Sequence, residues 1–131
     1  MAEQERRPFV SAPESGEALD TPAGPLISFV AYGEQTGGAL TAFESTAAPG
    51  EGPPFHLHVR EDETIYVLEG RLRVRLGDDI HEAPAGSFVF MPHGIPHAWQ
   101  NEGEDSALLL VLFTPSERAL PRPAFWLGPR S

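Results

Sequence analysis

The sequence predicts a single all-β domain, and three observations support this fold class. First, the chain divides into short apolar and β-branched runs, most of which end at Gly, Pro, Asp or Asn. Second, Arg71–Leu76 alternates arginine with Leu or Val, which is the period of a strand with one buried face. Third, 13 Gly and 14 Pro supply many turns, and no segment has a convincing helical period. A sandwich or barrel of short strands fits this pattern.

The chain is expected to have an extended arm, one β-domain and a short tail. Residues 1–25 are rich in Pro, Glu, Ser, Gly and Ala, so we expect a flexible or extended N-terminal arm. Residues 26–115 hold the strand-like runs and form the domain. Residues 116–131 form the tail, in which Phe125 and Trp126 stand between prolines and are expected to dock on this chain or on a neighbouring subunit.

Each expected strand is a short run of apolar or alternating residues between turn residues. Glu69-Gly70 is expected to close one hairpin, and Gly77-Asp78-Asp79 another. The run Ala107–Thr114 is the most apolar and has the length of a buried strand rather than of a membrane span. The expected strands are Leu26–Tyr32, Ala39–Ser45, Phe55–His58, Thr64–Leu68, Leu72–Leu76, Ser87–Met91, His97–Gln100 and Ala107–Thr114.

Composition excludes several classes of function. The 131 residues have a net charge of -10, which argues against nucleic acid or an anionic membrane as the main partner. The chain has no cysteine, which excludes disulfides, thiolate nucleophiles and thiolate metal sites. All nine basic residues are arginine, which excludes a lysine Schiff base. No apolar N-terminal segment suggests secretion, so a cytoplasmic protein is the default expectation.

Two spaced motifs place four metal-ligating side chains among the expected strands and turns. The first motif runs from Gly50 to Gly70 and contains His56, His58 and Glu63; the second contains His97. His56 and His58 lie two residues apart, so on a strand both rings point to the same side. Glu63 follows a short turn at the start of the next strand and can face the same pocket.

Three imidazoles and one carboxylate suit one divalent transition metal ion: Fe, Mn, Co, Ni, Cu or Zn. Four protein ligands in a five- or six-coordinate site leave one or two positions open, as in a catalytic centre. The formal charge of such a site is +1, which favours an enolate, a carboxylate or a reduced oxygen species. The metal ligands expected are therefore His56, His58, Glu63 and His97.

The two motifs resemble those of the cupin superfamily: GEGPPFHLHVREDETIYVLEG for the first and GSFVFMPHGIPHAWQN for the second. The resemblance covers about Ala39 to Thr114, and the segment between the motifs, Arg71 to Ala85, is similar to that of the shortest cupins. It implies a single jelly-roll β-barrel with one metal in its mouth, held by the four residues named above. It leaves the reaction open, because the superfamily hosts many chemistries on one scaffold.

Other polar residues of the two motifs are expected to have structural roles. His81 and His93 are expected at the surface, and Asn101 is expected to hold a turn through side chain to backbone hydrogen bonds. Trp99 shares strand parity with His97, so it is expected in the core near the site. The candidates for the pocket wall are Phe55, Tyr66, Phe88, Phe90 and Met91, each of which also fits a plain core position.

Three uses of such a site stay open. The phrase HLHVREDETIYVLEG is similar to bacterial quercetin 2,3-dioxygenase-like monocupins, which implies a dioxygenase acting on a small enolic or aromatic, flavonol-like substrate, with Glu63 as catalytic base. The alternatives are a non-redox Lewis-acid enzyme, either a polyketide cyclase or an isomerase, and a non-catalytic small-molecule-binding protein. The partner expected is a small molecule, without nucleic acid or membrane, and similar monocupins imply a homodimer.

Overall fold

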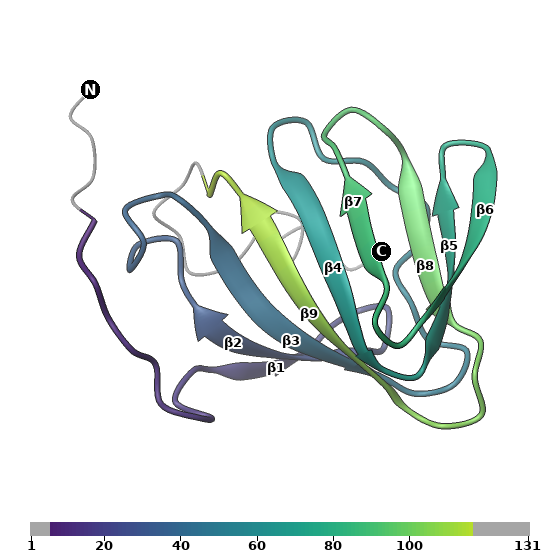
Figure 1. Ribbon diagram of the computed structural model, residues 1–131, viewed down its shortest axis with the longest axis horizontal. Helices are drawn as coiled ribbons and strands as arrows, with labels where there is room; N and C mark the ends of the chain where they lie inside the picture. The colour runs from purple at the N-terminus through teal and green to yellow at the C-terminus, as the bar shows by residue number, and fades with distance from the viewer. Residues whose placement is uncertain (1–5, 117–131) are drawn as a thin grey trace.

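The computed structural model describes residues 6–116, which form nine strands in two antiparallel sheets (Figure 1). The larger sheet has the order β1-β2-β3-β9-β4-β7, and the smaller has the order β6-β5-β8. The strands are β1 (Ala18–Asp20), β2 (Leu26–Ala31), β3 (Thr41–Ala47), β4 (Asp62–Glu69), β5 (Arg71–Leu76), β6 (Asp79–Pro84), β7 (Phe88–Met91), β8 (His97–Asn101) and β9 (Ala107–Thr114). The all-β prediction is confirmed for the described part of the chain.

One core lies between the sheets, because both contribute their buried faces to it. From the larger sheet, Phe43, Ile65 and Val111 are almost fully buried; from the smaller sheet, Leu72 and Val74 are. The alternation predicted in Arg71–Leu76 is confirmed, since Leu72 and Val74 point inward and the arginines outward. Burial of these apolar side chains supplies the main driving force for the fold.

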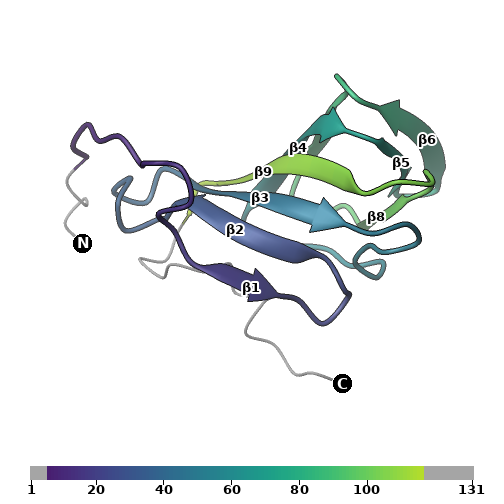
Figure 2. The same ribbon diagram turned by 90° about the horizontal axis from the view of Figure 1, so that it is seen from below.

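The longest-range pairings fix the position of the motifs. Strand β9 lies between β3 and β4, and Phe113 pairs with both Thr41 and Glu63. Chain segments that are far apart in sequence therefore lie side by side in the larger sheet, as Figures 1 and 2 show. This arrangement brings the beginning of β4 to the interior of the molecule.

Two elements were not predicted, and one predicted strand is irregular. Strand β6 is exposed along most of its length and polar, so it lacks the hydrophobic period that marks a strand. Strand β1 lies within the segment expected as an arm and pairs with β2 alone. The run Phe55–His58 forms only an isolated bridge, between His56 and His97, instead of a full strand.

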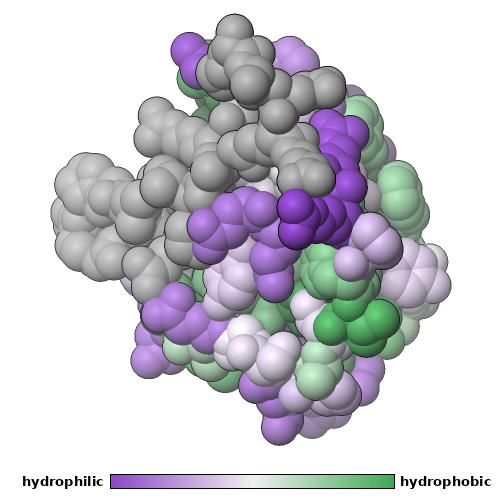
Figure 3. Space-filling model, turned by 90° about the vertical axis from the view of Figure 1, so that its left-hand side faces the viewer, coloured by the Kyte–Doolittle hydropathy of each residue, from purple (hydrophilic) through white to green (hydrophobic). Residues whose placement is uncertain are grey.

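One end of the molecule presents apolar groups at its surface. At the end of the molecule seen in Figure 3, a group of hydrophobic residues is bordered by strongly hydrophilic ones. Between residues 6 and 116, no helix has the length and apolarity needed to cross a membrane. The predicted tail lies outside the described residues except for Ser116, whose hydroxyl is 2.9 Å from that of Thr41.

Candidate metal centre

The four predicted ligands converge in one buried cluster. The candidate ligand atoms of His56, His58, Glu63 and His97 all lie within 4.8 Å of one another. His58, Glu63 and His97 are buried, and His56 is half-buried. No other group of three or more His, Asp or Glu residues with this geometry occurs in the described residues.

Backbone pairing explains how the two motifs meet. The segment around His56 lies antiparallel to the start of β8, where the His56 N–H donates to the His97 carbonyl at 2.9 Å and the His97 N–H donates back at 2.7 Å. The Gly94 N–H donates to the His58 carbonyl at 2.8 Å. These bonds hold the first motif against the turn of the second, so the imidazoles reach the interior from neighbouring segments.

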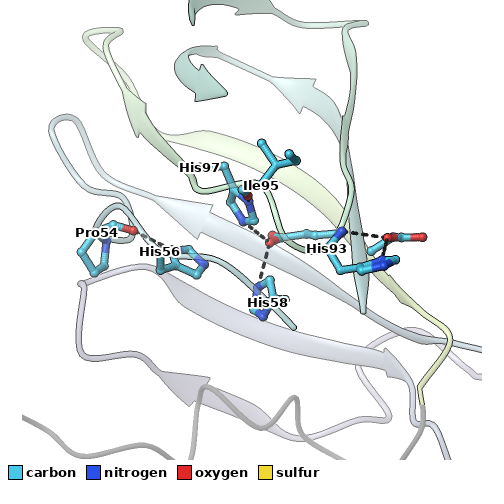
Figure 4. Close-up of polar contacts among 8 residues, drawn as sticks. Pro54, His56, His58, His93, Ile95 and His97 are labelled. Atoms are coloured by element: carbon cyan, nitrogen blue, oxygen red, sulfur yellow. Dashed lines mark hydrogen bonds and ion pairs between the residues drawn. The ribbon is translucent and has the colours of Figure 1, made fainter. Parts of the chain in front are cut away.

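Backbone carbonyls orient two of the imidazole rings (Figure 4). The Nδ1 atom of His56 is hydrogen-bonded to the Pro54 carbonyl, and that of His97 to the Ile95 carbonyl at 3.1 Å. A carbonyl oxygen only accepts, so each Nδ1 carries the proton and the neutral ring presents a lone pair at Nε2. This type of contact fixes ring orientation at metal centres.

The Glu63 carboxylate lies at the centre of the cluster. Its Oε1 atom is 3.1 Å from His97 Nε2 and 3.4 Å from His58 Nε2. With the Nδ1 proton of His97 donated to Ile95, a neutral His97 presents a lone pair to a carboxylate oxygen. A cation or a proton between His97 Nε2 and Glu63 Oε1 would interact favourably with both lone pairs. Several imidazole nitrogens with free lone pairs around one carboxylate suit a divalent metal ion.

The pKa shifts favour the protonation states that a metal ion needs. Burial lowers the pKa of His56, although its hydrogen bond to Pro54 opposes the shift. Burial alone would raise the pKa of Glu63, but its close contacts with the His58 and His97 rings outweigh burial, and the net shift is downward. Neutral imidazole and ionised carboxylate are the forms that bind metal, so the residues present fit a bound divalent ion.

The two other histidines stand apart from the cluster, as predicted. His81 is exposed on β6. His93 is mostly exposed, and both its backbone N–H and its ring nitrogen Nδ1 contact Asp62 Oδ1, at 2.9 and 2.8 Å. The backbone and side-chain hydrogen bonds from His93 lower the pKa of Asp62. This pair ties the turn before β8 to the first residue of β4, beside Glu63.

The predicted role of Asn101 is also supported by its contacts. Its side-chain amide donates to the carbonyls of Ala47 and Asp105, at 3.0 and 2.8 Å. Its side-chain oxygen accepts from the Gly103 N–H at 2.8 Å. The buried side chain thus fastens the turn between β8 and β9.

The prediction of aromatic pocket walls was largely wrong. Tyr66, Phe88 and Phe90 lie on the outer face of the larger sheet, because Glu63 pairs with Met91 and strand parity turns the intervening side chains outward. Phe55 is also exposed, and the guanidinium of Arg75 lies 3.9 Å from its ring centre. Of the five candidates only Met91 is buried.

A small cavity adjoins the cluster, and most of its walls were missed. Besides His56 and Glu63, it is lined by Thr21, Ala23, Pro25, Phe43, Ser45, Pro53, Trp99 and Val111. Trp99 was expected near the site, and the structure places it there. The residues of β3 carried one sequence signal: Ser45 is polar at an inward position, two residues after Phe43. The turn that contains Ala23 carried none, because its position depends on how β1 and β2 pair.

Comparisons with known proteins agree with the fold and the motifs. The family model described as Cupin domain matches residues 43–113. Protein SchB of Streptomyces halstedii is 32% identical over 90 residues, covering 67% of this chain and 63% of that protein. Polyketide synthase CurC of Streptomyces cyaneus is 32% identical over 82 residues, covering 61% of this chain and 53% of that protein. Quercetin 2,3-dioxygenase of Bacillus subtilis (strain 168) is 26% identical over 84 residues, covering 64% and 25%.

The chain spans less than two thirds of the length of these curated relatives. Among solved structures, KdgF from Halomonas sp. has a TM-score of 0.73 at 23% identity, covering 83% of this chain and 94% of that one. The polyketide cyclase RemF from Streptomyces resistomycificus has a TM-score of 0.69 at 20% identity, covering 89% and 83%. At these identities the structural matches show a shared fold, and the family model confirms the resemblance that the two motifs predicted.

Proposed function

This chain belongs to the cupin domain family, and from that premise we propose that it is a metal-dependent enzyme acting on a small enolic or aromatic molecule. The observation that carries the proposal is the convergence of His56, His58, Glu63 and His97 on one buried point. A divalent first-row metal ion supplies Lewis-acid activation of an oxygen ligand there and, if redox-active, electron transfer.

The chain's own residues have separate roles in this proposal. The three imidazoles and the Glu63 carboxylate bind the ion, and the carbonyls of Pro54 and Ile95 hold two of the imidazole rings in place. Glu63 accepts the proton of the substrate's enolic or phenolic hydroxyl on a carboxylate oxygen, which leaves the substrate oxygen anionic.

The apolar part of the cavity wall supports this role of Glu63. Phe43, Val111 and Trp99 are buried beside the carboxylate and limit the amount of water that reaches it. A site with little water strengthens the attraction between a metal ion and an anionic oxygen.

The first reaction class is dioxygenation of a flavonol-like or related enolic substrate. It is supported by the quercetin 2,3-dioxygenase relative and by a ligand set that redox-active ions accept. Dioxygen is then the second substrate.

The second reaction class is non-redox proton transfer and ring closure on a polyketide-like chain, or isomerisation. A specific observation favours it: identity to the polyketide synthase CurC is 32%, against 26% to the dioxygenase. The fold of the polyketide cyclase RemF is also shared. In this class Glu63 moves a proton and no oxidant is consumed.

Loading the chelated protein with single metals separates these classes. Fe²⁺, Mn²⁺, Co²⁺, Ni²⁺, Cu²⁺ and Zn²⁺ are added in turn, and oxygen uptake and substrate loss are followed with a flavonol and with a poly-β-keto thioester. Oxygen uptake that needs a redox-active ion supports the dioxygenase. Anaerobic turnover that also proceeds with Zn²⁺ supports the non-redox enzyme. Tight ligand binding without turnover by any metal-loaded form would contradict both reaction classes and indicate a binding protein.

Glu63→Gln tests the proton-accepting role. The amide keeps the shape and one oxygen but accepts no proton at neutral pH, so we expect turnover to fall at least about 100-fold while some metal binding remains. Asp62→Asn is the matched control, because it removes a neighbouring carboxylate that contacts His93 instead of the cluster. Unchanged turnover in Glu63→Gln would refute the role.

A further inference from the structure

The cavity beside the cluster is too small for an organic substrate as it stands. Its volume is about 20 Å³, which is of the order of the about 10–15 Å³ that one water molecule occupies. One or two waters fit, whereas an enolic or aromatic molecule does not. Such a molecule therefore enters this cavity only if part of the wall moves.

Four residues of the wall lie in strands that are paired on both sides. Phe43 and Ser45 belong to β3, which pairs with β2 and β9, and Val111 belongs to β9, which pairs with β3 and β4. Glu63 in β4 has neighbours on both sides as well. Moving any of these residues would break two ladders of backbone hydrogen bonds.

The wall that is not held by a strand on each side includes the turn between β1 and β2, Thr21–Pro25, which contributes Thr21, Ala23 and Pro25 to the cavity. Strand β1 has three residues, lies at the edge of the larger sheet and pairs with β2 alone (Figure 2). Lifting this turn therefore disturbs one short ladder at most.

The turn is held closed by hydrogen bonds within itself. The Thr21 N–H and hydroxyl donate to the Pro25 carbonyl at 3.1 and 2.7 Å, and the Gly24 N–H donates to the Thr21 carbonyl at 3.1 Å. In the described part of the chain, no hydrogen bond joins the turn to another wall of the cavity. The side chain of Glu51 lies beside Gly24, where an added Cβ would come within 2.5 Å of its carboxylate.

We propose that the Thr21–Pro25 turn is the movable wall of the metal pocket and determines the size of the ligand that reaches His56 and Glu63. In the closed position the pocket takes only water-sized or dioxygen-sized molecules. Displacement of the turn opens it to an organic ligand. The proposal rests on the proposed function for the identity of that ligand, but the movement of the turn is testable without metal or substrate.

The absence of native cysteine allows a direct test. Ser45→Cys places a single thiol in the cavity wall, opposite the turn, and its reaction rate with a bulky disulfide reagent reports opening. Thr21→Val removes the hydroxyl that closes the turn and keeps a side chain of nearly the same shape. We expect it to raise the reaction rate about two- to tenfold, as the loss of one hydrogen bond predicts.

Thr36→Val in the same Ser45→Cys background is the matched control. The Thr36 hydroxyl contacts the carbonyls of Gly33 and Leu40 and closes the turn between β2 and β3, which does not line the cavity. We expect no more than a small change in rate. Equal acceleration by both valine variants, or by neither, would overturn the proposal.

A second measurement covers the case in which Ser45→Cys does not fold. In a Trp126→Phe background, acrylamide quenching reports on Trp99, whose side chain is buried at the cavity. Thr21→Val should raise the quenching constant about two- to tenfold and Thr36→Val should not; equal quenching in the two variants refutes the movable turn.

A chain that opens in this way but binds no metal would contradict the proposed function alone, and a loaded enzyme whose turn does not open would contradict this inference alone.

Discussion

His58 and His97 both contact the Glu63 carboxylate, whereas His56 lies nearer the cavity and is half-buried. Of the four candidate ligands, His58, Glu63 and His97 therefore depend directly on one another for their positions. His58 also packs against the Phe113 ring, with ring centres 5.0 Å apart. At the scale of residues, the centre is a set of polar groups held by apolar neighbours and backbone carbonyls.

His58→Ala is expected to weaken metal binding. Loss of a residue that merely orients a ligand costs about 10- to 100-fold in affinity, so loss of a ligand should cost at least about 100-fold. Binding of Co²⁺, followed by its visible absorption, measures the effect. His81→Ala, which removes an exposed histidine on β6, should bind Co²⁺ as the unmodified chain does. Similar affinity in the two variants would argue against His58 as a ligand.

The metal-free protein is expected to lose stability from His56 as the pH falls. Burial lowers the pKa of this ring below its ordinary value of 6.5, so below pH 6.5 the unfolded chain binds a proton that the folded chain does not. The lowered pKa of Glu63 acts in the same direction at more acidic pH, because its stabilisation is lost as the pH falls through the folded-state pKa.

Urea unfolding at pH 7.5 and pH 5.0, in the presence of a chelator, measures the His56 contribution. The unmodified chain should lose more stability between these values than His56→Gln, whose side chain does not titrate. Because the two proteins have the same carboxylates, the contribution of these groups to the pH dependence cancels in the comparison. The same pH dependence of stability in both proteins would show that burial does not lower the pKa of His56.

At the scale of elements, the turns at Gly70 and Gly86 determine how the chain passes between the two sheets. Gly70 joins β4 of the larger sheet to β5 of the smaller, and Gly86 joins β6 to β7. Their φ angles are nearly equal, at 92° and 93°. An added Cβ at Gly70 would lie 2.8 Å from the Cα of Ala107, whereas at Gly86 it would meet open space. A side chain would therefore collide with a neighbouring strand at Gly70 and not at Gly86.

This pair separates backbone strain from steric overlap. Gly86→Ala should lower the free energy of unfolding by about 1–2 kcal/mol, the cost of a left-handed backbone for an L-residue. Gly70→Ala should lower it by about 1–3 kcal/mol more, because the methyl group overlaps β9. Thermal or urea unfolding measures both. Equal losses would show that Ala107 moves aside without cost.

At the scale of the whole molecule, one outer face is unusually apolar for a chain of net charge -10. Tyr66 pairs with both Phe88 and Leu110, and Thr64 pairs with both Phe90 and Leu112, so these outward side chains form a continuous face over β7, β4 and β9. Phe88 is 70% exposed and Phe90 50%. A face with so little charge suits contact with a second acidic copy of the chain, since repulsion there is small.

We expect this face to lie in a homodimer. Phe88→Glu combined with Phe90→Glu should weaken dimerisation at least about 100-fold, because central aromatic residues dominate such interfaces. Light scattering and sedimentation at micromolar concentration measure the mass. Val59→Glu, at an exposed apolar residue outside this face, is the control and should remain dimeric. A monomeric unmodified chain would contradict the expectation.

Much of the fold was predictable because its signals are local. The alternation in Arg71–Leu76 and the apolar run Ala107–Thr114 identify strands without knowledge of their partners. Strand β6 was missed because nearly all its residues are exposed, so it shows no buried face. The aromatic walls were misplaced because the outward or inward direction of Phe88 and Phe90 depends on the register with β4.

The sequence by itself determined the strand-rich fold, the turns and the four residues that can hold a metal ion, because these depend on short-range period and on ligand chemistry at fixed spacing. Only the tertiary structure decided which side chains surround that centre. The cavity wall joins residues from the β1–β2 turn, β3, β8 and β9, and the pairing and register of strands distant in the chain set those contacts. Register is fixed by cooperative burial over the whole core, so a local pattern does not reveal it.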